Sequence, residues 1–253
     1  MLELKNVSRH FGGVKAVDGL NLQVRQGEIL GLIGPNGSGK STTVNLIAGL
    51  YKPTAGTIHF KGQNVDDLAQ HQRCELGIAR TFQNIRLFGT LTVWQNIWAA
   101  RVVRASGWAG IRERWLSGAK AAREQAEALL TFCDLADKRD MLAGNLAFGE
   151  QRRLELARAA VSGAELLLLD EPAAGMNAEE IDDLDNRIRK LRDDGRTILL
   201  IEHHMELVMG VCDRVAVLNF GRKIAEGTPA QVQDDPQVRT AYLGSDAPVA
   251  KAA

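Results

Sequence analysis

Runs of apolar residues divide the chain into strand-length and helix-length segments. Leu2–Val7 and Leu20–Val24 alternate apolar and polar side chains, which predicts half-buried antiparallel strands near the start of the chain. Nearly continuous apolar runs of strand length follow, and such runs are typical of parallel strands that are covered on both faces. These runs are Glu28–Ile33, Glu165–Leu169, Thr197–Ile201 and Arg214–Leu218.

Apolar residues at helical spacing lie between these runs. A short pattern formed by Val44, Ile47 and Ala48 follows the run that ends at Ile33. Strands that alternate with helices predict an α/β core with a parallel sheet. A longer amphipathic pattern stops at Gly195, and its apolar positions are Ile181, Leu184, Ile188 and Leu191.

The middle of the chain differs from both ends. From about residue 84 to 161 it carries helical patterns without a convincing strand, together with Trp94, Trp98, Trp108 and Trp115. We therefore predict one domain over 1–244, in which a helical subdomain at about 84–161 is inserted into an α/β core formed by 1–83 and 162–244. The closing residues, 245–253, are small and polar, so we expect a disordered tail.

Composition narrows the classes of protein that fit this pattern. The 253 residues include 31 Lys and Arg and 31 Asp and Glu, and a formal net charge of zero argues against a nucleic-acid partner. No apolar run approaches the ~18 residues of a membrane-spanning helix, and the first residues lack the plan of a signal peptide. The 3 cysteines are far apart in the sequence, which fits a reducing compartment. We expect a cytoplasmic location.

A glycine-rich segment between the first continuous run and its helix fits the phosphate-loop pattern G-x-x-x-x-G-K-[ST]. Backbone N–H groups of such a loop converge on a phosphate at a helix N-terminus. Lys40 is expected to reach the β- and γ-phosphates of a nucleoside triphosphate, and the Ser41 hydroxyl to bind Mg²⁺. The expected nucleotide contacts are Gly34, Pro35, Asn36, Gly37, Ser38, Gly39, Lys40, Ser41 and Thr42.

Two acids close the run Leu166–Leu169. Asp170 stands at the predicted strand tip, where its carboxylate can complete the Mg²⁺ shell through water. Glu171 follows beyond the sheet and is placed to accept a proton from an attacking water molecule. A carboxylate base favours hydrolysis over transfer of the phosphoryl group to a metabolite. The sequence therefore predicts a nucleoside triphosphatase.

Taken together, these motifs make the sequence resemble the ATP-binding subunits of ABC transporters over nearly its whole length. The segment Leu146, Ala147, Phe148, Gly149, Glu150, Gln151 is similar to the family's signature, usually Leu-Ser-Gly-Gly-Gln. Its first five residues are then expected to contact nucleotide from the N-terminus of the helix that follows. The resemblance implies an ABC ATPase fold with a parallel sheet, an antiparallel β region and the inserted helical subdomain.

Four further roles are implied by the resemblance. Gln83 matches the glutamine that senses Mg²⁺ and links the core to the helical subdomain, and His203 matches the histidine that contacts the γ-phosphate. Phe11 matches the aromatic residue that stacks on adenine, and Ala173–Asn177 matches the loop that crosses to the partner subunit. The expected catalytic residues are therefore Glu171, His203, Gln83 and Lys40, and the expected metal ligands are Ser41, Gln83 and Asp170.

Three positions depart from the family pattern. Ala147 replaces the signature serine, and Asn177 replaces an aspartate. His204 stands where an aspartate often follows the histidine that contacts nucleotide. We assign that role to His203 because it comes directly after the strand and Glu202.

Longer stretches resemble the branched-chain amino-acid importers within this family. They are Ala79–Phe88, Pro172–Asn177 and Ile201–Pro229; the closing stretch Val238–Gly244 is similar also to the lipopolysaccharide-export ATPase. The resemblance implies a twofold dimer, of identical or related chains, on the cytoplasmic face of the cell membrane. It also implies two membrane-spanning permease subunits and, indirectly, a periplasmic or extracellular substrate-binding protein.

Other functions stay open at this point. Lipopolysaccharide export and a soluble, non-transport ABC ATPase are the alternatives, while the signature-like segment and Glu171 disfavour a P-loop kinase. The helix after Gln83 carries Leu91, Trp94 and Trp98 on one face. These three residues line a groove for the permease or belong to the core of the helical subdomain.

Overall fold

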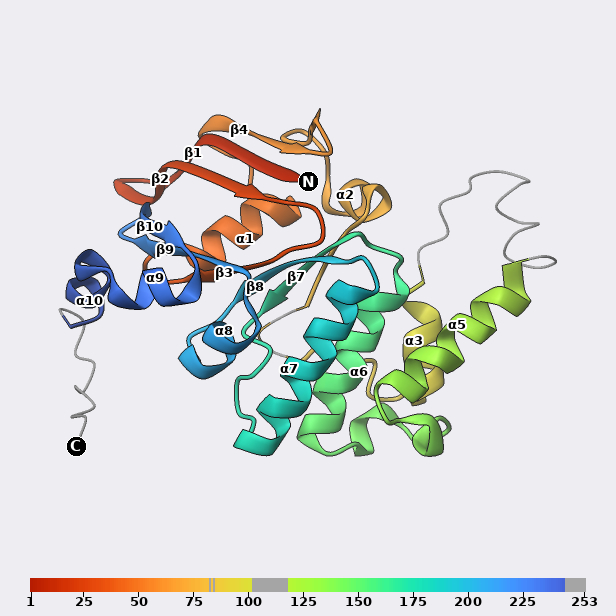
Figure 1. Cartoon of the computed structure of the whole chain (residues 1–253). Coiled ribbons are helices and arrows are strands. Elements are labelled where there is room, and N and C mark those ends of the chain that lie inside the picture. The colour runs from red at the N-terminus through yellow and green to blue at the C-terminus, as the bar shows by residue number, and fades with distance from the viewer. Residues whose placement is uncertain (82, 84, 102–117, 244–253) are drawn as a thin grey trace, which may run out of the picture.

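Two β-sheets of different topology organise the chain (Figure 1). The computed structural model describes residues 1–81, 83, 85–101 and 118–243. Phe82, Asn84, Trp108, Trp115 and the expected disordered tail at 245–253 lie outside the described residues.

The first sheet is antiparallel and has the strand order β2-β1-β4-β5. Leu2 pairs with Val24 and Leu4 with Leu22, which confirms the two alternating strands that the sequence predicts. The sequence pattern did not predict β4 and β5, because β4 buries only Ile58 and Phe60 and β5 is exposed. The strands are β1 (Leu2–Phe11), β2 (Val14–Val24), β4 (Ala55–Phe60) and β5 (Gln63–Asn64).

The second sheet has the order β10-β9-β3-β8-β7-β6 and is parallel except for the β9–β10 pair. The continuous apolar runs form its four central strands, as predicted. The sequence pattern predicted neither edge strand, since β6 is very short and β10 is largely half-exposed. The strands are β3 (Ile29–Ile33), β6 (Ile78–Arg80), β7 (Leu166–Asp170), β8 (Thr197–Ile201), β9 (Arg214–Asn219) and β10 (Arg222–Gly227).

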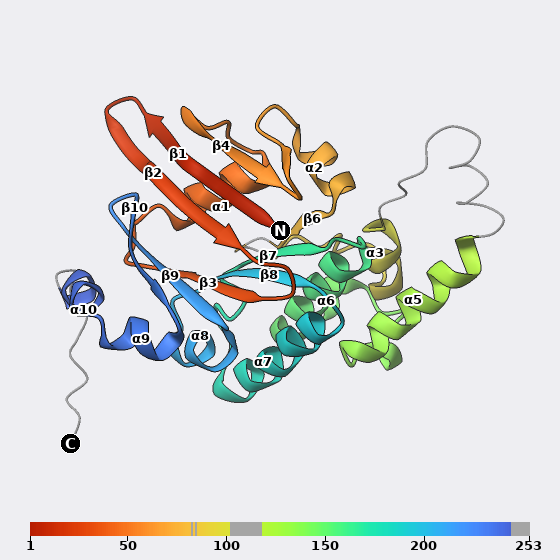
Figure 2. The ribbon, with the colours of Figure 1, turned by 45° about the horizontal axis from the view of Figure 1, so that its top comes forward.

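Burial on both faces explains why the central strands are apolar at every position. Leu166 and Leu168 of β7 pack toward the first sheet, whereas Leu167 and Leu169 pack toward the helices on the opposite face. Successive side chains of a strand point to opposite faces, so both sets must be apolar. The helix α1 (Lys40–Ala48) lies between the two sheets (Figures 1 and 2).

Helices cover the other face of the second sheet (Figure 1). The predicted amphipathic helix corresponds to α7, which ends at Asp193 just before Gly195 at φ 89°. The elements on this face are α6 (Phe148–Val161), α7 (Ala178–Asp193), α8 (Met205–Val211), α9 (Pro229–Asp234) and α10 (Pro236–Leu243).

A separate apolar cluster holds the helical part of the chain together. Val93, Ile97, Ala126, Leu130 and Leu154 are fully buried in it. Between residues 85 and 161 the described residues form helices and one isolated bridge, without a strand. The elements are α3 (Val93–Ala99), α5 (Gly118–Phe132), the 3₁₀ turns η2 (Ala136–Lys138) and η3 (Ala143–Asn145), and the start of α6. A short α2 (Gln70–Leu76) precedes β6.

No helix among the described residues combines the length and the apolar character needed to cross a bilayer.

Candidate functional site

The phosphate loop links β3 to α1 and is held closely by its neighbours. A Cβ atom on Gly34 would lie 2.1 Å from the Leu218 carbonyl oxygen, and one on Gly39 would lie 2.4 Å from the Ala16 carbonyl oxygen. Both glycines have positive φ, 148° and 105°. A side chain at either position would displace the loop from the strands, so the sequence pattern is a steric requirement of this fold.

Lys40 folds back over the loop that precedes it. Its Nζ donates to the carbonyl oxygens of Gly34 at 2.6 Å and Pro35 at 3.1 Å. Burial lowers the pKa of Lys40, and the nearby carboxylates of Glu171 and Asp170 oppose that shift. A desolvated ammonium group held by two carbonyl oxygens is well placed to exchange these contacts for phosphate oxygens.

The hydroxyls of the loop differ in their surroundings. Among the described residues, the buried Ser38 Oγ has no hydrogen-bond partner, which is uncommon for a buried polar atom and fits a missing ligand. Ser41 is exposed and Thr42 half-buried in the first turn of α1. The loop therefore presents an unsatisfied buried hydroxyl at a helix N-terminus, where an anion is favoured.

Asp170 is held at the tip of β7 by two residues from the end of β6. The Arg80 guanidinium donates to its Oδ2 at 2.8 Å, and the Asp170 N–H donates to Thr81 Oγ1 at 3.2 Å. Arg80 also donates to Asn45 Oδ1 of α1 at 2.6 Å. Asp170 is only 4% exposed. The Arg80 contact orients its carboxylate, and the Thr81 contact fixes its backbone. The sequence analysis did not predict that Arg80 contacts Asp170.

Glu171, Gln83 and His203 come together beyond the strand tips. Glu171 has φ 49°, which turns its side chain out of the line of the strand. Gln83 Nε2 donates to Glu171 Oε2 at 2.7 Å, and His203 Nδ1 lies 3.9 Å from the same oxygen. Two residues that are far from Glu171 in the sequence thus lie around its carboxylate, near Lys40.

The signature-like segment begins α6 and packs against α7 of the same chain. Ala147 donates its N–H to Glu150 Oε2 at 3.1 Å, and Lys138 donates to Glu150 Oε1. The Lys138 ammonium holds the pKa of Glu150 below its usual range. A Cβ atom on Gly149 would lie 2.4 Å from Glu180 Oε1, so this glycine allows α7 to approach. Leu146 is buried and Phe148 is 47% exposed.

Phe11 ends β1 in an aromatic and cationic group. Its ring meets the Tyr51 ring edge-on, with centroids 5.2 Å apart, and the Arg9 guanidinium lies 4.7 Å from the Phe11 centroid. The side chain is 40% exposed, an unusual state for a phenylalanine in a strand. An exposed aromatic ring with neighbours that limit its motion suits stacking on a planar base.

Glu202, His203 and His204 each offer one potential metal-ligand atom, and these atoms lie within 4.8 Å of one another. The Glu202 carboxylate, however, already accepts three backbone N–H groups. This arrangement makes Glu202 a structural acceptor rather than a free ligand. The sequence predicted a functional role for His203 and no role for Glu202.

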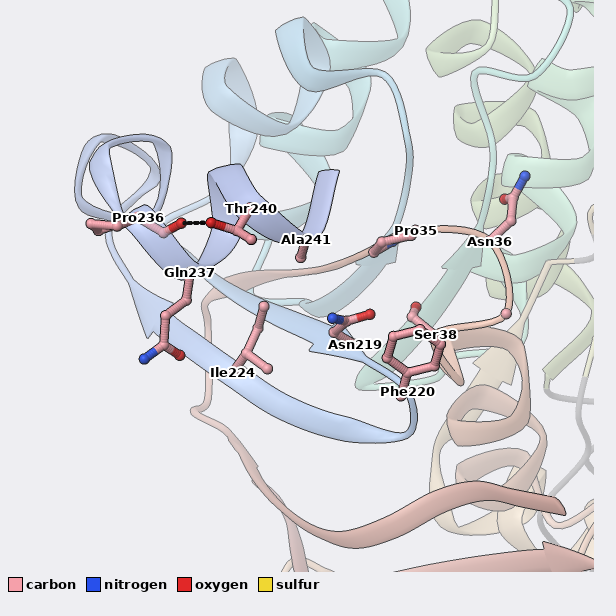
Figure 3. Close-up of a pocket in the computed structure, with 11 residues that line it drawn as sticks. Pro35, Asn36, Ser38, Asn219, Phe220, Ile224, Pro236, Gln237, Thr240 and Ala241 are labelled. Atoms are coloured by element: carbon pink, nitrogen blue, oxygen red, sulfur yellow. Dashed lines mark hydrogen bonds between the residues drawn. The ribbon is translucent and has the colours of Figure 1, made fainter. Parts of the chain in front are cut away.

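A cavity of about 630 Å³ borders the phosphate loop on the side of the β9–β10 hairpin and α10 (Figure 3). Its walls are the loop segment 35–38, Phe220 and neighbours in the β9–β10 hairpin, and α10. Next to it, the Tyr242 hydroxyl hydrogen-bonds to the Gly34 backbone, and burial raises the pKa of Tyr242 to about 12. The contact between α10 and the phosphate loop has no signal in the sequence pattern.

A second hollow, of about 470 Å³, lies between α2, β6 and α6. Arg80, Arg86, Phe88 and Arg158 are among its lining residues. Trp94 packs against the helical cluster and stacks on Trp98, with ring centroids 4.9 Å apart. Of the two readings of Trp94, the structure therefore supports core packing.

The sequence matches the family described as "ABC transporter" over residues 17–174, and "Branched-chain amino acid ATP-binding cassette transporter" over 222–248. It is 42% identical to the high-affinity branched-chain amino acid transport ATP-binding protein BraF of Pseudomonas aeruginosa, covering 96% of this chain and 98% of the relative. The corresponding protein LivG of Escherichia coli is 43% identical, with the same coverage. The lipopolysaccharide export ATP-binding protein LptB of Haemophilus influenzae is 34% identical, covering 96% of this chain and 97% of the relative.

Solved structures agree with the fold. The ADP conformation of an ATP-binding cassette of an ABC transporter superposes with a TM-score of 0.83 at 30% identity, covering 96% of this chain and 98% of that one. The two sheets and the helical region thus have the arrangement of an ATP-binding cassette.

Proposed function

This chain belongs to the ABC transporter family and is an ATPase, and we propose that it powers import of branched-chain amino acids as the ATP-binding subunit of a membrane transporter. The observation that carries the proposal is the meeting of Glu171, Gln83 and His203 beside Lys40 and Asp170. The cargo follows from the names of the relatives and from the match at residues 222–248.

In the proposed hydrolysis, Glu171 is the general base. Its carboxylate accepts a proton from the attacking water, which Gln83 and His203 hold in place from either side. Lys40 and the loop N–H groups bind the phosphates and stabilise the charge that develops on them. Phe11 stacks on adenine at the open end of β1.

The donor set fits a Mg²⁺ ion. Ser41 offers an exposed hydroxyl, Gln83 an amide oxygen and Asp170 a carboxylate, and oxygen ligands of this kind suit the ion. A Mg²⁺ ion held there with ATP would neutralise charge on the phosphates. Asp170 is oriented for this role by Arg80 and Thr81.

A second ATP-binding subunit, identical or related, completes each site in the proposed assembly. The segment Leu146–Glu150 packs on α7 of its own chain, and Phe148 is exposed beside Gly175 of the loop Ala173–Asn177. These two segments therefore form one surface, which we assign to the nucleotide of the partner subunit. Closure of such a twofold dimer on ATP drives the transporter.

The hollow between α2, β6 and α6 is the proposed seat of a permease segment. The hollow is open to solvent, and two of its lining residues, Arg80 and Arg86, flank Gln83 in the sequence. Its lining combines apolar side chains with Arg86 and Arg158. Two membrane-spanning permeases would place this subunit peripherally on the cytoplasmic face of the membrane. A periplasmic or extracellular binding protein would deliver the amino acid to them.

Uptake by cells whose only copy of this subunit carries Glu171→Gln tests the proposal. We expect ATP binding to persist, hydrolysis to fall to at most ~1% of normal, and uptake of leucine, isoleucine and valine to stop. Glu179→Gln is the matched control, because Glu179 is an exposed acid on the first turn of α7.

The parallel cargoes decide between the functions. Urea and other amino acids should enter normally in the Glu171→Gln cells. Unchanged branched-chain uptake, with the protein present and its ATPase lost, would rule out the importer. A defect in lipopolysaccharide at the cell surface would instead support export, the function named for the 34% identical relative.

A further inference from the structure

Glu202 is a fully buried acid directly after the last residue of β8. Its exposed fraction is 0%, and carboxylates are rarely found in this state unless they are paired or hydrogen-bonded. It stands between the two loops that carry Glu171 and His203. A carboxylate buried at this position requires hydrogen-bond donors from the groups around it.

Three backbone N–H groups from two loops donate to this one carboxylate. Ala173, two residues after Glu171, donates to Oε1 at 2.8 Å. His203 and His204 donate to Oε2 at 2.9 and 3.2 Å. The two oxygens of Glu202 therefore divide their partners by loop.

The end of β8 makes a further link between the same loops. The Glu171 N–H donates to the Ile201 carbonyl oxygen at 2.9 Å, so the chain is fixed immediately before and after Pro172. His203 Nδ1 lies 3.8 Å from Glu202 Oε2 and 3.9 Å from Glu171 Oε2. The spacing of Glu171 and His203 thus depends on how both backbones sit around Glu202.

We propose that Glu202 is a positioning residue, which sets the distance between Glu171 and His203 by holding both of their loops on one carboxylate. The inference rests on the proposed hydrolytic function and assigns Glu202 no contact with nucleotide. Its effect is transmitted through the backbones of Ala173 and His203.

Only a side chain with two acceptor oxygens can accept hydrogen bonds from both loops. A glutamine at position 202 has one acceptor oxygen, so its NH₂ group would face an N–H donor from one of the two loops. An aspartate keeps both acceptors but is shorter by one methylene, so it cannot reach both loops without moving them. Both substitutions leave the residues of the phosphate loop unchanged, since that loop connects β3 to α1.

The test compares Glu202→Gln and Glu202→Asp with the unaltered chain in the assembled transporter. We expect kcat for ATP to fall roughly 10- to 100-fold, the scale of a displacement of about 1 Å in a reacting group. The Kd for ATP should stay within about twofold. Glu206→Gln is the matched control, because Glu206 is an exposed acid on the first turn of α8.

A double-variant cycle separates positioning from a general loss of structure. Because Glu202 sets the spacing between Glu171 and His203, Glu202→Gln should lower the single-turnover rate by a smaller factor in the His203→Ala background than in the unaltered chain. Multiplicative losses, or a normal kcat in folded Glu202→Gln or Glu202→Asp, would overturn the inference. If Glu202→Gln does not fold, the same cycle on Glu202→Asp decides.

The proposed function fails separately. Normal hydrolysis in Glu171→Gln would remove the catalytic assignment itself, whatever Glu202 does. A defective Glu171→Gln beside a fully active, folded Glu202→Gln would leave the ATPase assignment intact and remove only the positioning role.

Discussion

Single residues explain the departures from the family pattern. Asn177 caps α7, since its Oδ1 accepts the Glu180 N–H at 3.0 Å and its own N–H donates to Glu180 Oε2 at 2.9 Å. Asparagine is as good an N-cap as aspartate, so the helix loses nothing by the exchange. Ala147 begins α6 without a side-chain cap, and Glu150 satisfies its N–H instead. The ring centroids of His204 and His203 lie 4.5 Å apart.

Phe11→Ala tests the adenine contact at this scale. We expect the Kd for ATP to rise roughly 5- to 150-fold, because aromatic stacking on a base contributes about 1–3 kcal/mol. Titration with ATP and GTP should also show weaker discrimination between the two bases. Val14→Ala is the control, since Val14 is 66% exposed in the same hairpin. Equal ATP affinity in Phe11→Ala and the parent would make Phe11 a packing residue only.

At the scale of elements, α1 is held at both ends. Its N-terminus carries the phosphate loop, and its C-terminus is capped by Arg73 of α2, which is 1% exposed. The Arg73 guanidinium donates to the carbonyl oxygens of Leu46 at 2.6 Å and Ile47 at 2.9 Å. Burial lowers the pKa of Arg73. A cation at the C-terminus of a helix satisfies its free carbonyls and its dipole together.

Arg73→Met tests this anchor. The free energy of unfolding should fall by about 2–4 kcal/mol, because buried carbonyl groups lose their donors. Urea unfolding without nucleotide measures the change, with the exposed Arg123→Met of α5 as control. A loss below about 0.5 kcal/mol, the usual size for a surface substitution, would contradict the anchoring role.

At the scale of the whole molecule, three apolar clusters join two sheets and a helical region. The helix α6 belongs to two of them, since Leu154 lies in the helical cluster and Leu156 packs against the second sheet. One rigid helix thus connects the sheet that carries Asp170 to the helical region and to the signature segment at its own N-terminus.

ATP-dependent dimerisation tests the assembly. With Mg²⁺ and ATP, Glu171→Gln should elute as a dimer on size-exclusion chromatography, because it binds ATP without removing it. The same protein with ADP, and Lys40→Ala with ATP, should stay monomeric. Dimers that form only with a related ATP-binding subunit would identify a heterodimer. Dimers independent of nucleotide would contradict closure on ATP.

Local patterns were enough to predict much of this protein. The central strands β3, β7, β8 and β9 are apolar at nearly every position, and the phosphate loop is a contiguous motif whose glycines are required sterically. In both cases the physical constraint acts within a few consecutive residues. The resemblance to ABC ATP-binding subunits added Gln83, His203 and Phe11, whose types alone are uninformative.

Tertiary structure decided what depends on pairs of distant residues. The strands β4, β6 and β10 each bury two side chains at most and are stabilised by pairing with neighbours. Arg80 on Asp170, Tyr242 on Gly34, and Glu202 between two loops are contacts across the chain. Such contacts leave no periodic signal, because their free energy depends on burial and distance, which exist only after the strands have assembled.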